Sequence, residues 1–259
     1  MAERIFPWRL LQTGCHNAYY NMGLDEALLE SVSQGSSPPV LRLYGWKPPA
    51  VSLGYFQGFE EEVDAEVCAG LGVDIVRRIS GGGAVFHDKE ITYSLIMPQD
   101  HPLAGNSIMD SYEKLCSGIV AGLLLLGIEA VFAPINDILA SERKVSGNAQ
   151  TRRQGCVLQH GTILLDTDVD RMFSLLKVPQ EKMKGKLIQD IKARVTGLYT
   201  LLGREISFDE GAEALAQGFK KSLGLDYVSM EDAPTTAEEE RALSLAEEKF
   251  ASPQWLHRR

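Results

Sequence analysis

The spacing of apolar positions predicts several amphipathic helices. Leu24, Leu28 and Val32, for example, return on one face every three to four residues. A shorter helix is expected to begin with the acidic residues at Glu60, because carboxylates favour a helix N-terminus, and to end at Gly70. The other helices are expected at 21–33, 110–126, 168–176, 208–223 and 236–250.

Runs rich in β-branched and aromatic residues predict strands between these helices. The strands are expected at 40–44, 50–55, 73–76, 91–96, 128–132, 144–150 and 157–165. The first two should form a hairpin across the Gly- and Pro-containing turn 45–49, and the last two a hairpin across 152–155. Strands and helices do not alternate steadily, so the fold class is α+β, with mixed sheets and flanking helices.

Three consecutive glycines, Gly81, Gly82 and Gly83, lie between two of the predicted strands and follow Arg77 and Arg78. Backbone N–H groups in such a turn can hold an anion, and arginine forks suit carboxylate or phosphate. One interpretation is therefore a small-molecule site for a carboxylate, a phosphate or both. The other is a plain bend with a solvated arginine pair. The pattern is neither a P-loop nor a dinucleotide-binding turn.

Composition narrows the function without identifying it. The chain has 259 residues and a formal net charge of −9, which argues against sequence-independent binding to nucleic acid. Its most apolar run, 123–126, is too short to span a membrane. The four cysteines form no C-x-x-C pair, which argues against a zinc knuckle or a disulfide scaffold. A reducing, cytoplasmic location is expected.

Lys144 is the sharpest single candidate for chemistry. It precedes small and polar residues that let a ligand approach the backbone, and its ammonium could neutralise a carboxylate or phosphate. The alternative is a solvated lysine at a strand end. Asn136 and Asp137 could supply a metal ligand or a ribose contact, or simply form a turn.

Other residues have two interpretations each. His87 and His160 could be ligands, but lone histidines beside strands are more often structural. Cys156 could be a nucleophile only if a neighbour lowered its pKa; the alternative is a buried structural thiol. The basic run 182–186 is either a solvated loop or a lid over a ligand.

Taken together, the motifs resemble the lipoate–protein ligase family, within the superfamily of biotin/lipoate ligases and octanoyltransferases. The matching segments occur in family order over nearly the whole chain: RRISGGGAVFHD from Arg77, NDI from Asn136, RKVSGNAQ from Arg143 and HGTIL from His160. The resemblance implies a catalytic domain over 1–205, with 206–259 as a helical C-terminal portion of the same domain.

The resemblance implies ATP-dependent activation of lipoate, or octanoate, as an acyl-AMP with Mg²⁺. The acyl group would then pass to a lysine of a lipoyl domain or glycine-cleavage H protein. Lys144 would be catalytic and would also contact the nucleotide. The implied substrate-binding residues are Arg77, Ser80, Gly81, Gly82, Gly83, His87, Ser146, Gly147, Ala149 and His160. The implied nucleotide-binding residues are Ala84, Val85, Phe86, Asn136 and Asp137, with Asp137 also holding the metal.

Departures from the ligase pattern keep a second activity open. The stretch 88–93 looks more like that of the cysteine-dependent octanoyltransferases, which take octanoyl from acyl carrier protein through a thioester. Their cysteine-bearing segment, however, is replaced here by the ligase-like 133–137, which leaves Cys156 as the candidate thiol. The extra C-terminal domain of some ligases has no counterpart in the sequence, which leaves open a separate small accessory chain as a partner. A non-enzymatic carrier-binding protein is the third alternative.

Overall fold

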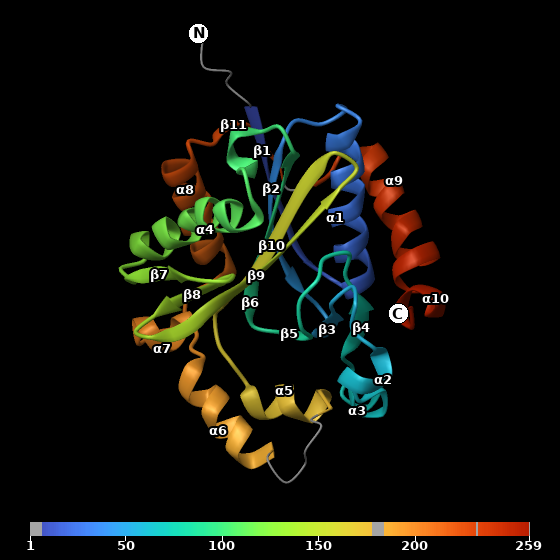
Figure 1. Ribbon diagram of the computed structural model, residues 1–259, viewed down its shortest axis with the longest axis vertical. Helices are drawn as coiled ribbons and strands as arrows, with labels where there is room; N and C mark the ends of the chain where they lie inside the picture. Colours follow the sequence, from blue (N-terminus) through green and yellow to red (C-terminus); the bar gives the residue numbers. More distant parts are fainter. Residues whose placement is uncertain (1–6, 178–183, 232, 259) are drawn as a thin grey trace.

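The computed structural model describes residues 7–177, 184–231 and 233–258. An eight-stranded mixed sheet runs through the molecule in the order β11–β1–β2–β6–β10–β9–β8–β7 (Figure 1). Its strands are β1 (Pro7–His16), β2 (Val40–Trp46), β6 (Glu90–Pro98), β7 (Ala130–Ala133), β8 (Asp137–Ala140), β9 (Arg143–Arg153), β10 (Cys156–Leu164) and β11 (Asp226–Glu231). The α+β prediction is confirmed.

Helices and a second sheet cover the two faces of the large sheet. On one face, α4 (Ile108–Leu125) and α8 (Phe208–Leu223) bury the larger apolar cluster, which includes Leu95 and Phe219. On the other face, α1 (Ala18–Ser33) packs a second cluster, with α9 (Thr236–Leu245) outside it (Figure 1).

A three-stranded sheet lies beside α1 in the order β4–β3–β5. Its strands are β3 (Ala50–Leu53), β4 (Asp74–Arg77) and β5 (Val85–His87). The glycine run therefore connects two strands of this small sheet that both pair with β3. The remaining helices are α2 (Phe59–Glu62), α3 (Ala65–Gly70), α5 (Val169–Leu175), α6 (Lys184–Arg194), α7 (Leu198–Leu202) and α10 (Pro253–Leu256).

Strongly periodic segments were predicted best. The helix expected at 208–223 coincides with α8, and those at 21–33 and 110–126 match α1 and α4 within three residues. The predicted hairpin of β9 and β10 is also confirmed. The helix 236–250 continues from α9 into a π-helical segment, Ala246–Phe250.

Other expectations were wrong because they assumed local pairing. The strands at 40–44 and 50–55 do not form a hairpin: β2 pairs with β1 and β6 in the large sheet, whereas β3 belongs to the small sheet. The acidic-headed helix is divided into α2 and α3, because Val63 forms a bridge with Leu176 and Asp64 caps a new helix.

Four strands were missed, and one expectation lies partly outside the described residues. The missed strands are β1, β5, β8 and β11, and β11 shows that the segment 206–259 also contributes an edge to the large sheet. Of the basic run, 182 and 183 are not described, and α6 begins at Lys184. No helix in the described part of the chain is both long and apolar enough to cross a bilayer.

Candidate active site

Lys144 is aimed back over its own strand by a bulge between β8 and β9. The register passes from Ile138 opposite Ser146 to Leu139 opposite Lys144, so one extra residue on β9 changes the alternation of its side chains. The Lys144 ammonium consequently lies above Gly147, where a Cβ would be only 2.9 Å from Nζ. Asp137, which pairs with Gly147, accepts an ion pair from Lys144 Nζ at 2.7 Å. Both side chains remain partly exposed.

Because paired residues on neighbouring strands share a face, the register separates the predicted residues of β9 into two groups. Gly147 and Ala149 share the face of His160, which looks toward α1 and the small sheet. Ser146 pairs with Ile163 of the other core and lies on the opposite face, with its Oγ buried and unpaired among the described residues. The prediction that Ser146 contacts the same ligand as Lys144 does not fit this geometry.

Arg78 is buried and holds the glycine run in place. Its Nη1 donates to the Ser52 carbonyl at 2.9 Å, and its Nη2 donates to the carbonyls of Gly81 at 2.8 Å and Gly83 at 2.7 Å. Burial lowers the pKa of Arg78 to about 10, which still leaves it charged at neutral pH. A Cβ on Gly54 would lie 2.0 Å from the Gly82 carbonyl oxygen, so glycine is required there.

Arg77 is turned away from the site. Its guanidinium donates to the carbonyls of Gly54 at 2.9 Å, Gln57 at 2.6 Å and Leu256 at 2.6 Å. The Trp255 indole returns a 2.8 Å bond to the Arg77 carbonyl. The predicted direct contact of Arg77 with substrate is not what this arrangement provides. Arg77 instead joins α10 to the loop after β3.

A buried carboxylate–imidazole–hydroxyl chain fixes the residue before the glycines. His160 Nδ1 lies 3.3 Å from Asp25 Oδ2, and His160 Nε2 lies 2.6 Å from Ser80 Oγ. Burial opposes the charge on Asp25, but the hydrogen bond from His160 and the nearby Arg42 outweigh it and lower the pKa of the carboxyl. An ionised Asp25 requires the proton on Nδ1, so Nε2 accepts the Ser80 hydroxyl.

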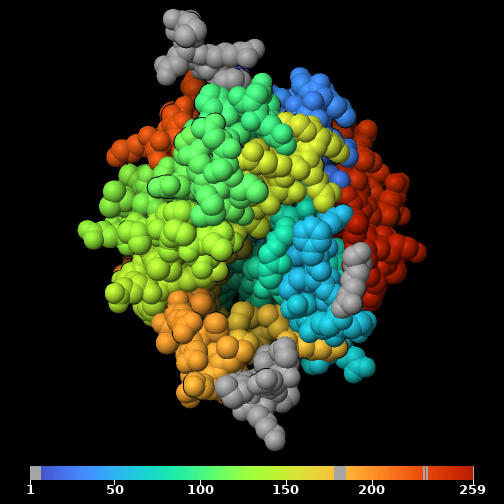
Figure 2. Space-filling model, viewed as in Figure 1, coloured from blue at the N-terminus to red at the C-terminus, as the bar shows by residue number. Residues whose placement is uncertain are grey.

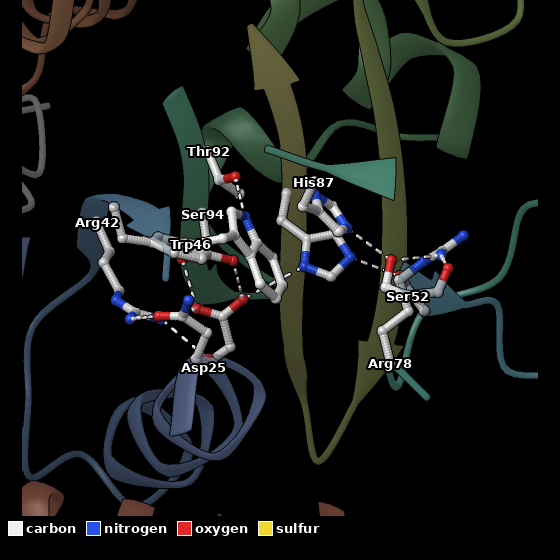
Figure 3. A network of polar contacts seen from close by, with 12 residues as sticks. Asp25, Arg42, Trp46, Ser52, Arg78, His87, Thr92 and Ser94 are labelled. Carbon is white, nitrogen blue, oxygen red and sulfur yellow. Dashed lines mark hydrogen bonds and ion pairs between the residues drawn. The ribbon is translucent and has the colours of Figure 1, made fainter. Parts of the chain in front are cut away.

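A second chain of the same kind runs through His87. Its Nδ1 lies 2.7 Å from Glu90 Oε1, and its Nε2 lies 2.7 Å from Ser52 Oγ, which also accepts a bond from Arg78 (Figure 3). The His87 ring stacks on Trp46 with centroids 4.0 Å apart. The two predicted histidines are thus buried supports of the glycine run. Sequence reasoning missed Asp25, Ser52 and Glu90, whose local patterns are those of an ordinary helix or strand.

Asn136 supports the turn before β8. Its side-chain amide donates to the Asn148 carbonyl, and Asn148 returns a 2.8 Å bond to the Asn136 carbonyl. The Asn148 side chain also accepts the Tyr93 hydroxyl at 2.7 Å. These contacts fix the turn that places Asp137 opposite Gly147. The predicted role of Asn136 in nucleotide binding stays a prediction.

None of the four cysteines is placed as a nucleophile beside Lys144. Cys156 is 1% exposed and pairs with Arg153, nine residues along β9 from Lys144, on the order of 30 Å at strand spacing. Burial raises the pKa of the Cys156 thiol, and raises that of Cys116 to about 12. Cys68 lies in α3, and Cys15 at the end of β1.

Two cavities lie near the glycine run, and the smaller one includes Gly81. The larger, of about 560 Å³, is lined by mostly charged residues and includes Phe86, Glu90 and Val195, whose backbone bridges to Lys144. The smaller, of about 300 Å³, includes Ile79, Gly81 and Thr151. Figure 2 shows the surface hollowed where β9 and the small sheet meet α5 and α6. Ala84 and Val85 precede Phe86 in the sequence, but neither residue lines either of these two cavities.

The site unites one cation, a backbone strip free of bulky side chains and a braced glycine loop, in a mixed sheet flanked by helices. A fixed positive charge over bare backbone suits an enzyme site that holds a carboxyl or carbonyl group. The chain belongs to the lipoyl protein ligase A/B catalytic domain family, whose model matches residues 17–220. It is an enzyme of the lipoate ligase and octanoyltransferase group, as the sequence motifs predicted.

Curated relatives and solved structures point to different members of this group. The chain is 37% identical to octanoyltransferase LipM of Geobacillus kaustophilus over the whole of both chains. It is also 37% identical to LipM of Moorella thermoacetica, covering 97% of this chain and 98% of that one. A bi-partite lipoate protein ligase of Thermoplasma acidophilum, solved with its E2 lipoyl domain, matches with a TM-score of 0.87 and 31% identity over 98% of both chains.

A lipoate-protein ligase A bound with ATP matches with a TM-score of 0.81 and 30% identity, over 97% of this chain and 98% of that one. These structures confirm the ligase-like fold. The names of the relatives favour octanoyl transfer over the ATP-dependent ligation that the motifs led us to expect first.

Proposed function

We propose that the chain transfers a medium-length acyl group, octanoyl in the first place, to a lysine of a lipoyl-carrier protein. The observation that carries the proposal is the position of Lys144, whose ammonium lies over the bare backbone of Gly147 beside Asp137. A carbonyl oxygen placed above Gly147 would meet a fixed positive charge. The names of the curated relatives support octanoyl as the acyl group.

The acyl chain has a suitable path along the same face of β9. From Gly147 past Ala149 to Thr151 the strand advances about 13 Å, somewhat more than an extended eight-carbon chain. Gly147 and Ala149 are small, and Thr151 lines the smaller cavity together with Ile79 and Gly81. In this proposal, the glycine run forms the wall of the acyl path opposite β9, because Gly81 lines the smaller cavity together with Thr151.

In the proposed reaction, the acceptor amine attacks the carbonyl carbon of an acyl thioester. The Lys144 ammonium stabilises the negative oxygen of the tetrahedral intermediate, as preorganised donors do in acyl transfer. The C–S bond then breaks, the thiol leaves with a proton, and the amide forms. Because Cys156 is buried, distant and of raised pKa, we expect transfer directly from donor to acceptor, without a thioester on Cys156.

The placement of the two arginines supports a thioester donor over a triphosphate. Arg77 and Arg78 are buried and spend their donors on backbone carbonyls, so neither is presented to phosphate groups. A triphosphate near Lys144 would need other cations to neutralise it.

A second candidate function is that of an ATP-dependent ligase. Two observations favour it: no cysteine thiol lies beside Lys144, and a structurally similar lipoate-protein ligase A was solved with bound ATP. Asp137 beside Lys144 is the carboxylate that would hold Mg²⁺ together with phosphate oxygens. No cluster of three or more metal-binding side chains occurs among residues 7–177, 184–231 and 233–258, so phosphates would supply most ligands. A separate accessory chain would be required under this candidate if the ligase is bi-partite, like the Thermoplasma protein.

Intact mass of an apo carrier protein distinguishes the candidates. One reaction contains octanoyl-acyl carrier protein without ATP; the other contains ATP, Mg²⁺ and lipoate. An octanoyl adduct in the first supports the proposal, whereas a lipoyl adduct only in the second establishes the ligase.

Lys144→Met should lower the rate of acyl transfer to the carrier protein by about 10²–10³-fold with the fold intact, and Cys156→Ser should leave this rate unchanged. Full activity of Lys144→Met would overturn the assigned role of Lys144.

A further inference from the structure

One end of the large sheet carries an open, apolar strip that leads to Lys144. Across the last three strands, Val131 of β7 pairs with Leu139 of β8, which pairs with Lys144 of β9. Paired residues share a face, so the three side chains form one row. The next row is Ala133, Asp137 and Gly147. The strip therefore joins the edge of the sheet directly to the residues of the candidate active site.

The strip is exposed to solvent at its outer end. Val131 is 62% exposed, and Ile135, in the turn that follows β7, is 67% exposed. On the opposite face of the same strands, Phe132 and Ala140 pack in the core beneath α4. Within the described part of the chain, β7 has a single hydrogen-bonded neighbour, β8, so its outer edge also presents backbone groups. Exposed apolar side chains on an edge strand mark a surface suited to another protein.

Two surfaces lie near Lys144, and they differ in character. The larger cavity, beside Val195, is lined by Glu90, Asp166 and Arg171 among others, which suits a polar arm or leaving group. The strip on β7 and β8 is apolar and ends at the outer edge of β7, which suits a folded domain. From β7 to β9 the distance is two strand spacings, about 10 Å, which a lysine side chain extended from a docked domain can largely span.

Resting on the proposed function, we propose that the docking surface for the acceptor protein is the strip of Val131 and Leu139, together with the exposed Ile135 of the turn that follows β7. Its occupant is a small carrier domain that places an apolar β surface on β7 and presents its lysine to the acyl carbon beside Lys144. The acyl donor enters from the charged cavity instead.

The test introduces charge into the strip and measures the Michaelis constants of the two protein substrates separately. Val131→Glu and Ile135→Glu should each raise KM for the apo carrier protein by about tenfold or more, because a carboxylate buried against an apolar partner surface is unfavourable. KM for the acyl donor should not change. Leu243→Glu is the matched control, since Leu243 is 52% exposed on α9 and should leave both constants unchanged.

A small amine separates docking from chemistry. With hydroxylamine as the acceptor, Val131→Glu should react as fast as the wild type, because no docked domain is needed. An unchanged KM for the carrier protein, or a raised KM for the donor alone, would overturn the docking surface. Failure of the wild type with hydroxylamine and every donor would instead count against the proposed function. Val131→Thr, which keeps shape and strand preference, should remain close to wild type and shows that the effect requires charge.

Discussion

Individual side chains in this site act mainly through their neighbours. Ser80 is positioned by His160, His160 by Asp25, and Asp25 is in turn bound by Arg42 at 2.8 Å. The same arrangement recurs in the chain from Glu90 through His87 (Figure 3). A neutral imidazole fits the chain through His160, because the ring then donates from Nδ1 and accepts at Nε2. Protonation of His160 would remove the acceptor at Nε2, and the Ser80 hydroxyl would have to change from donor to acceptor.

Buried neutral histidines make the stability of the fold depend on pH. Burial lowers the pKa of His160, and lowers that of His101 to about 4. In the unfolded chain both titrate near 6.5. Below that pH the unfolded state binds more protons, so the stability present above about 6.5 should be lost progressively as the pH falls toward 4.

Urea unfolding at a series of pH values between 7.5 and 4.5 measures this dependence. The free energy of unfolding should fall with a limiting slope of about 1.4 kcal/mol per pH unit for each histidine. His101→Gln should flatten the slope, whereas His257→Gln, at an exposed position, should not. A wild-type free energy of unfolding that stays constant down to pH 4.5 would contradict the lowered pKa values of His160 and His101.

At the level of elements, glycines set how closely the two helices α4 and α8 approach. A Cβ on Gly218 would lie 2.2 Å from the backbone nitrogen of Gly122, and one on Gly118 would lie 2.1 Å from the Phe219 ring. Backbone atoms cannot yield as a flexible side chain can. Gly218→Ala should therefore lower the free energy of unfolding by about 1–3 kcal/mol, as overpacking does.

Denaturation with urea checks this prediction against a glycine in open space. Gly185, near the start of α6, has no atom within 4 Å of an added Cβ, so Gly185→Ala should leave stability unchanged or slightly raised. If Gly218→Ala is as stable as wild type, the close approach of α4 and α8 does not require glycine at position 218.

The elements also show what the sequence could and could not reveal. Helix α8 was predicted to the residue because its apolar stripe and its Ser207 cap are local signals. The pairing of β3 with β4 and β5 was missed because it depends on a partner from another part of the chain. Lys144 and the glycine run were found from motifs. The bulge that puts Ser146 on the other face is a property of the pairing with β8, and no local pattern encodes it.

At the scale of the whole molecule, Arg77 joins α10 near the C-terminus to the loop that follows β3. Arg77 and residues of α10 are far apart in sequence, yet Arg77 binds the Leu256 carbonyl and Trp255 binds the Arg77 carbonyl. Arg77 also binds the carbonyls of Gly54 and Gln57, and the intervening Tyr55 donates its backbone N–H to the Ser80 carbonyl at 2.9 Å. The conformation of the glycine run therefore depends on the C-terminal segment.

Arg77→Lys tests this connection. Lysine keeps the charge, but its single ammonium cannot reach carbonyls on both sides of a planar fork, so buried acceptors would be left unpaired. We expect a loss of about 2–4 kcal/mol in the free energy of unfolding. We also expect a lower kcat for acyl transfer at temperatures where the variant is fully folded, with little change in KM for the carrier protein.

The control is Arg241→Gln, which breaks a surface ion pair with Glu30 and should change the free energy of unfolding by less than about 1 kcal/mol. An Arg77→Lys enzyme with wild-type kcat would mean that α10 stabilises the fold without positioning the glycine run.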